Sequence, residues 1–209
     1  MTLLYLIRHG ECLSNLSDKF AGQTDYELTE TGKLQAELLS KYFVDVNVDC
    51  IYSSDLSRAY DTIIPTAKVK ELKINKSKNL RKIDGGEWEQ EDYDVIAKKY
   101  SEEFFVWRHD LENAVCPGGE SVEELGNRFF KEIYRIINEN ENKSIIVATH
   151  ALAIRTFFPK VNKKNITEIK WVSNASVSSF EYKDNIFCPI EIGYDDFLGD
   201  LTTTLGNNI

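Results

Sequence analysis

The chain has 209 residues, with 25 lysines and arginines against 34 aspartates and glutamates, so its formal net charge is −9. Nucleic-acid binding needs a basic face that releases counterions, so this charge argues against a nucleic-acid partner. Because 42% of the residues are apolar and 11% are aromatic, the chain can bury a substantial core, which excludes disordered and fibrous proteins. We expect a single domain over residues 1–209.

The sequence carries no signal for a membrane or for a structural metal. No apolar run approaches the ~18 residues of a membrane helix, and the N-terminus opens on an apolar run without a basic leader. We therefore expect a cytoplasmic protein with no membrane partner. The cysteines form no Cys-x-x-Cys pair, which favours reduced thiols over a zinc site or disulfides. They are Cys12, Cys50, Cys116 and Cys188.

Short apolar runs alternate with longer segments of helical period, which is typical of an α/β layered domain. The strands predicted from these runs, in chain order, are residues 3–8, 49–53, a weak one at 72–74, 144–149, 177–182 and 186–192. The predicted helices are residues 29–43, 55–68 and 121–138. The last two strands are joined by Lys183-Asp184-Asn185, which predicts a hairpin at a sheet edge.

Two of the helices have capping signals at their starts. Thr29 is an N-cap candidate for the first helix, and Ser121 followed by Glu124 is a capping box for the third. Leucine and tyrosine recur at four-residue spacing after Thr29, which predicts that this segment is a helix. These residues are Leu34, Leu38 and Tyr42.

Residues 84–118 are charged, carry aromatics and lack a strand pattern. We expect this segment to form a helical lid insertion over one end of the sheet. It ends in the turn Pro117-Gly118-Gly119, immediately before the third helix.

Histidines and arginines gather just after three of the predicted strands. Arg8 and His9 follow the first apolar run, His150 follows the strand at 144–149, and Arg58 lies early in the second helix. Ligands of open α/β sheets bind at the carboxyl ends of strands. If the three strands are parallel neighbours, these four side chains meet at one point.

Two imidazoles and two guanidiniums concentrate positive charge that a core would not bury without an anion. A phosphoryl group fits best, because arginine offers planar, bidentate donors matched to phosphate oxygens. An imidazole in such a pocket can attack phosphorus and form a phosphohistidine, while the arginines stabilise the charge on the equatorial oxygens.

Six separated motifs follow one another along the chain between Leu3 and Arg155. They are residues 6–11 with Asn15; Gly22, Asp25 and residues 28–36; residues 52–59 with Thr62; Gly85 with Trp88-Glu89; residues 117–121; and residues 145–150 with Ile154-Arg155. Together and in this order they resemble the histidine phosphatase superfamily, also called the phosphoglycerate mutase-like superfamily.

The resemblance implies a three-layer α/β/α sandwich with a mixed, largely parallel central sheet, and neither a metal nor a cofactor. The residues themselves also argue against a metal, since adjacent arginines repel a divalent cation. The resemblance also implies a metal-independent phosphomonoester phosphatase that forms a phosphohistidine on His9 and acts on a small phosphorylated metabolite. Arg8, Arg58, His150 and Asn15 would form the phosphate pocket. The sequence does not fix the oligomeric state, and a homodimer is compatible with it.

The proton donor is where the sequence departs from the family pattern. The family usually places a glutamate where Lys82 stands in Leu80-Arg81-Lys82-Ile83. Lysine has an ordinary pKa of about 10.4 and is a poor acid near neutrality unless strongly desolvated. If the segment is extended, Asp84 shares a face with residue 82 and is the favoured donor. Glu87, Glu89 or a leaving group that needs no proton are the alternatives.

Three further residues are expected to contact the substrate, namely Gln23, Lys82 and Ala151. Ala151 stands where the family usually has glycine, so a methyl group reshapes the pocket beside the phosphate. Two other functions stay open. Lys82 and Ala151 leave room for a protein that binds a phosphorylated ligand with little turnover. A phosphoglycerate-type mutase is the other, although the glutamate-bearing substrate motif and longer insertions expected of a mutase are not found in the sequence.

Overall fold

The computed structural model describes residues 1–162 and 165–204 and contains one six-stranded sheet of order β3-β2-β4-β1-β5-β6. The strands are β1 (Thr2–Arg8), β2 (Cys50–Ser54), β3 (Ile74–Ser77), β4 (Ser144–Thr149), β5 (Val177–Lys183) and β6 (Ile186–Tyr194). The first four of that order are parallel, and β5 runs antiparallel to both β1 and β6. This confirms the prediction of a mixed, largely parallel sheet.

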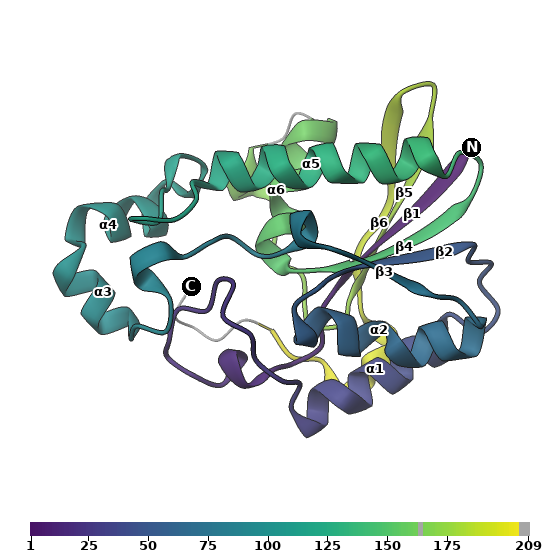
Figure 1. The fold of residues 1–209 in the computed structure, drawn as a ribbon, viewed down its shortest axis with the longest axis horizontal. Coiled ribbons are helices and arrows are strands. Elements are labelled where there is room, and N and C mark those ends of the chain that lie inside the picture. The colour runs from purple at the N-terminus through teal and green to yellow at the C-terminus, as the bar shows by residue number, and fades with distance from the viewer. Residues whose placement is uncertain (163–164, 205–209) are drawn as a thin grey trace.

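Helices cover both faces of this sheet, so the fold is the predicted three-layer sandwich (Figure 1). The helices are α1 (Glu30–Tyr42), α2 (Ser57–Lys70), α3 (Tyr93–Lys99), α4 (Ser101–His109), α5 (Val122–Glu139) and α6 (Ala151–Asn162). Strand β4 shows how the faces divide. Ile145 and Val147 join the core under α5 and α6, whereas Ile146 and Ala148 join the core under α1 and α2. None of the described helices is long and apolar enough to cross a membrane.

Local signals fixed the helix starts as predicted. The Thr29 hydroxyl accepts a hydrogen bond from the Gly32 amide at 3.0 Å. Ser121 and Glu124 form the reciprocal capping box, with bonds of 2.8 and 3.1 Å. Between β5 and β6, Asp184 and Asn185 both adopt positive φ, the conformation of a tight hairpin turn.

Helix α1 forms as predicted, but the residues it buries are not those whose spacing predicted the helix. Leu34 is 54% exposed, and the helix instead buries Gly32 and Gln35 against the chain that follows β1. A Cβ on Gly32 would lie 1.9 Å from the Glu11 carbonyl oxygen, and the Gln35 side chain accepts a hydrogen bond from the Glu11 amide. Close backbone contact, which hydrophobic spacing does not report, therefore sets the rotation of this helix.

Two other elements differ from the prediction. The weak strand expected at 72–74 is β3, Ile74–Ser77. Leu72 instead belongs to the end of α2, where its amide bonds to the Ala67 carbonyl after the left-handed Glu71. Helix α6 was not predicted from the sequence, which places Pro159 inside it, a residue that a helix interior disfavours.

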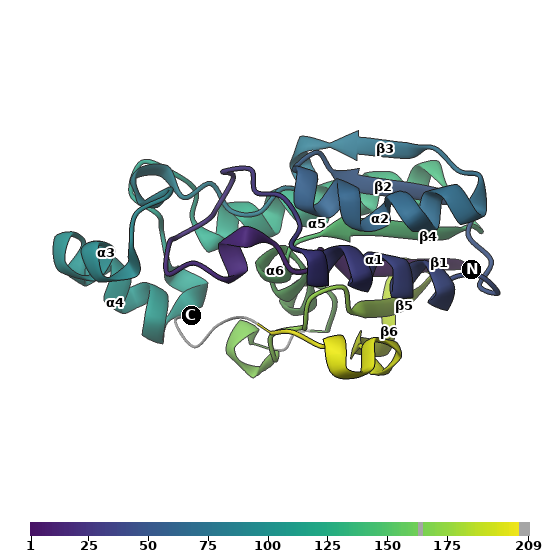
Figure 2. The same ribbon diagram turned by 90° about the horizontal axis from the view of Figure 1, so that it is seen from below.

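The insertion at 84–118 holds α3 and α4, which lie beyond the end of the sheet opposite the N-terminus (Figures 1 and 2). It is tied to the rest of the molecule by edge-to-face aromatic packing. The Phe20 ring lies 5.4 Å from the Trp88 ring and 5.3 Å from the Trp107 ring, measured between centroids. The helical insertion therefore extends the main core, and its action as a lid stays a prediction.

Candidate active site

The four side chains expected at one point do converge there. Arg8 is the last residue of β1 and His9 follows it, His150 follows β4, and Arg58 lies in the first turn of α2, after β2. All four are at most 5% exposed and line one cavity. The rings of His9 and His150 lie 5.2 Å apart between centroids. The parallel neighbours β1, β4 and β2 thus deliver the charges to one place.

His9 is arranged with one nitrogen free. Its Nδ1 lies 2.8 Å from the Gly10 carbonyl oxygen, and because a carbonyl can only accept, Nδ1 carries the hydrogen. In the neutral ring the lone pair is then on Nε2. Burial, followed by the charges of Arg58 and Arg8, holds the pKa of His9 well below its ordinary value. His9 is therefore a neutral imidazole with a free Nε2 lone pair at neutral pH.

His150 has the opposite arrangement. Its Nε2 lies 3.0 Å from the Ser54 hydroxyl, which also accepts a hydrogen bond from the Leu56 amide at 3.4 Å. We assign the single hydroxyl hydrogen of Ser54 to the bond with Nε2, which leaves the imidazole hydrogen on Nδ1. That buried Nδ1 has no protein partner. Burial, followed by the charge of Arg58, holds the pKa of His150 well below its ordinary value, so it is a neutral donor.

Both arginines are held by backbone carbonyls. Arg58 donates to the carbonyls of Gly22 and Thr24 at 2.8 and 2.9 Å. Arg8 donates to the carbonyl of Val172 at 2.6 Å, while its buried Nε and Nη2 have no protein partner. Burial lowers the pKa of Arg8 to about 10, so this guanidinium is still charged at neutral pH. Neutral partners leave the positive charge available for an anion.

The loop that holds Arg58 is itself held by Glu89, from the insertion. The Glu89 carboxylate accepts hydrogen bonds from the amides of Gly22, Gln23 and Thr24 at 2.6 to 3.2 Å, and from the Thr24 hydroxyl at 2.6 Å. A Cβ on Gly22 would lie 2.1 Å from a Glu89 oxygen, so only glycine allows this approach. Burial raises the pKa of Glu89, but these hydrogen bonds outweigh it and hold the pKa below its ordinary value.

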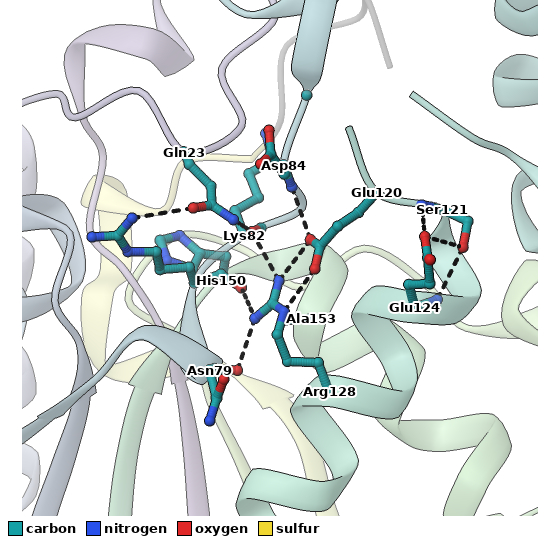
Figure 3. A network of polar contacts seen from close by, with 12 residues as sticks. Gln23, Asn79, Lys82, Asp84, Glu120, Ser121, Glu124, Arg128, His150 and Ala153 are labelled. Atoms are coloured by element: carbon teal, nitrogen blue, oxygen red, sulfur yellow. Dashed lines mark hydrogen bonds and ion pairs between the residues drawn. The ribbon is translucent and has the colours of Figure 1, made fainter. Parts of the chain in front are cut away.

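Of the other predicted site residues, Asn15, Lys82 and Ala151 line the cavity. Gln23 and Asp84 do not. The Gln23 side chain accepts from Arg81 at 3.1 Å, and the Asp84 carboxylate accepts from the Gly86 amide at 3.0 Å. Figure 3 shows the Asp84 carboxylate pointing away from His150. The structure therefore does not bring Asp84, the favoured proton donor, or Gln23 to the site.

The cavity measures about 30 Å³ and is also lined by residues that the sequence did not predict to be there. Tyr93 and Trp107 reach it from the insertion, and Trp171 reaches it from the segment before β5. The Arg155 guanidinium stacks 4.3 Å from the centre of the Trp171 ring. Nothing in the spacing of these aromatic residues marks them as site residues.

The described residues contain no group of three histidine, cysteine, aspartate or glutamate side chains that could hold a metal ion. What the cavity offers is cationic and neutral donors around one unprotonated imidazole nitrogen. This arrangement binds a tetrahedral anion and can accept a phosphoryl group on nitrogen.

The fold and the site together define a phosphoryl-transfer enzyme of the phosphoglycerate mutase type. The model of the histidine phosphatase superfamily (branch 1) matches residues 4–188. The chain belongs to this superfamily. That confirms the family predicted from the six sequence motifs, and the prediction of a phosphatase of that family.

Individual relatives are consistent with this. Phosphoserine phosphatase 1 of Hydrogenobacter thermophilus is 31% identical over 158 residues, which are 76% of this chain and 75% of that protein. A 2,3-bisphosphoglycerate-dependent phosphoglycerate mutase 2 of Gloeobacter violaceus is 30% identical, over 82% of this chain and 81% of its own. The solved structure of Bacillus stearothermophilus YhfR has the same fold, with a TM-score of 0.91 at 24% identity, covering 95% of this chain and all of that one.

Proposed function

We propose that this enzyme hydrolyses a phosphomonoester of a small metabolite through a phosphohistidine on His9. The observation that carries the proposal is the free Nε2 of His9, placed among the donors of Arg8, Arg58 and His150 in one buried cavity. Nε2 attacks phosphorus and the ester oxygen leaves. Water then attacks the phosphorylated His9 and releases inorganic phosphate.

The cationic and neutral donors divide the work of stabilising the transferring group. Arg8 and Arg58 keep their charge throughout and face the equatorial oxygens. His150 adds a neutral Nδ1 hydrogen, and Asn15 lies at the wall of the same cavity. All these groups are held by backbone or by buried partners, so little reorganisation is needed as charge redistributes.

A small metabolite is proposed because the charged groups lie in an enclosed cavity that Tyr93, Trp107 and Trp171 also line. A relative at 31% identity is named a phosphoserine phosphatase, so phosphoserine belongs in the first substrate panel. The cytoplasmic location, the absence of a nucleic-acid or membrane partner, and the homodimer remain predictions.

The test measures phosphate release from a panel of phosphorylated metabolites, including phosphoserine and 3-phosphoglycerate. We expect turnover by the wild type, and a loss of more than about 10³-fold in His9→Ala, because the nucleophile is gone. His109→Ala is the matched control, since His109 is exposed on α4, and it should keep full activity. A folded wild type that binds phosphate but releases none from any monoester would leave only the low-turnover binding function.

A mutase is the second candidate, favoured by the 30% identity to a phosphoglycerate mutase. A mutase must retain the phosphoryl group on His9 and return it to the substrate. Incubation of 3-phosphoglycerate with a bisphosphate primer separates the two. Formation of the 2-isomer faster than free phosphate identifies a mutase, and the reverse identifies a phosphatase.

A further inference from the structure

The cavity holds no carboxyl group to protonate a leaving oxygen. Among the described residues that line it there is no aspartate or glutamate. The three carboxylates nearest in sequence to residue 82 are committed elsewhere. Asp84 accepts from the Gly86 amide, Glu87 from the Tyr100 hydroxyl, and Glu89 from the loop that holds Arg58. An alkyl phosphate nevertheless needs a proton on its departing oxygen.

Lys82 is the proton-carrying side chain at the expected position of that acid. It lines the same cavity as His9 and His150, and its Nζ donates to the Ala21 carbonyl at 2.5 Å. That carbonyl takes only one of the three ammonium hydrogens. The Nζ also lies 5.5 Å from the centre of the Phe20 ring.

The surroundings of Lys82 make it a stronger acid than an ordinary lysine. Burial, followed by the charge of Arg58, lowers the pKa of Lys82 to about 8. Arg8 acts in the same direction, whereas Cys12 and Glu89 oppose it. The other titratable groups that interact with Lys82 are Cys116 and the rings of His9 and His150.

On the basis of the proposed function, we propose that Lys82 is the general acid of the first step and the general base of the second. As Nε2 of His9 bonds to phosphorus, the bond from phosphorus to the ester oxygen breaks, and a proton from the Lys82 ammonium neutralises that oxygen. Water then attacks phosphorus, its proton returns to the neutral Lys82 amine, and the electron pair of the phosphorus–nitrogen bond returns to His9. The ammonium is restored and no further reactant is needed.

The competing role for Lys82 is a fixed positive charge that attracts the substrate and moves no proton. Two substitutions separate the roles. Lys82→Arg keeps the charge but is a far weaker acid than Lys82, because a guanidinium holds its proton at every working pH. Lys82→Glu reverses the charge but restores a group that can carry a proton. Lys78→Arg is the matched control, because Lys78 is exposed in the same segment.

The experiment compares kcat/KM for an alkyl phosphate and for an activated aryl phosphate. In Lys82→Arg we expect a loss of about 10²–10⁴-fold on the alkyl ester, the usual value of general acid catalysis, and a much smaller loss on the aryl ester. Lys82→Glu should be the more active of the two variants on the alkyl ester. If Lys82→Arg equals the wild type, or exceeds Lys82→Glu, on the alkyl ester, Lys82 acts by charge alone and the proposal is wrong.

The pH profile is a second readout. The acid must be protonated, so alkyl ester kcat/KM of the wild type should fall as pH rises through about 8, and this limb should be missing in Lys82→Arg. An unchanged limb in Lys82→Arg contradicts the proposal. Thermal unfolding and inhibition by inorganic phosphate confirm that each variant is folded with its cavity intact.

This inference can fail while the proposed function stands. Trapping of labelled phosphohistidine on His9, with aryl ester hydrolysis in every Lys82 variant, establishes the phosphatase whatever the alkyl series shows. Absence of both from the wild type overturns the proposed function itself.

Discussion

The ends of the parallel strands and the insertion at 84–118 build the same cavity in different ways. The ends of β1, β2 and β4 supply the histidines and arginines proposed to meet the phosphoryl group, and Lys82 comes from the segment after β3. The insertion supplies two aromatic walls, from Tyr93 and Trp107, and the anchoring carboxylate of Glu89. The first region can therefore carry out the chemistry, and the second acts on it indirectly.

The comparison also explains how a buried cluster of cations is tolerated. Neither Arg8 nor Arg58 belongs to an ion pair of the described residues. Arg58 instead donates to two backbone carbonyls and Arg8 to one, and these neutral partners satisfy donors without cancelling charge. A carboxylate partner would have neutralised the site before the substrate arrived. The protein thus leaves the positive charge of its strand ends for the anion.

The largest effect should come from a change in the strand-end region. Arg58→Lys keeps one charge but cannot hold two carbonyls while also presenting a planar pair of donors to the phosphoryl group. We expect kcat/KM to fall by about 10²–10³-fold, or about 2.7–4 kcal/mol of transition-state stabilisation, and the free energy of unfolding to fall by about 1–3 kcal/mol, because a carbonyl of the loop at 22–24 loses its donor. Steady-state kinetics measures it, and Arg135→Lys on the outer part of α5 is the control. A loss of less than threefold would show that Arg58 is a structural residue.

The two regions also differ in how well the sequence predicted them. Arg8, His9, Arg58 and His150 were predictable, because each follows a regular strand whose end is fixed by the hydrophobic pattern. The path of residues 80–89 has no period, so the placement of Asp84 could not be read from spacing. A turn determines where Asp84 points. Gly86 adopts a φ of 51° and packs against the Pro117 carbonyl, and its amide donates a hydrogen bond to the Asp84 carboxylate.

The same reasoning applies to the fold. Capping residues such as Thr29 and Ser121 act locally, and the structure confirmed both. The rotation of α1 depends on contact between Gly32 and the Glu11 backbone, which is a tertiary fact. Helix α6 forms in spite of Pro159 inside it, so tertiary packing overrides a local signal against a helix.

An intermediate effect should come from the link between the two regions. Glu89→Gln removes the charge from the hydrogen bonds to the loop at 22–24 and leaves part of them unsatisfied. We expect the free energy of unfolding to fall by about 1–3 kcal/mol, and kcat/KM to fall less than in Arg58→Lys. Glu91→Gln, on an exposed neighbour, is the control. If activity is lost as completely as in Arg58→Lys, the insertion takes a direct part in the chemistry.

The stability effect of Glu89 should also depend on pH. Because the folded pKa of Glu89 lies below its ordinary value, its contribution is fully present above the unfolded pKa of about 4.3 and is lost as pH falls through the folded value. The difference in unfolding free energy between wild type and Glu89→Gln should therefore be constant near neutrality and shrink below about pH 4. Denaturant titrations across this range measure it, and a difference that grows on acidification would contradict it.

The smallest effect should come from the junction where the insertion ends and α5 begins. Ser121→Ala removes one half of the capping box, so the Glu124 amide loses its partner. We expect a loss of about 1 kcal/mol in the free energy of unfolding, measured by denaturant titration, and an unchanged kcat/KM. Ser121→Thr keeps the hydroxyl and should lose much less stability. If folded Ser121→Ala has a kcat/KM lower than the wild type by more than a few fold, the position of the insertion relative to α5 also affects the cavity. The strand ends alone would then not determine the geometry of the site.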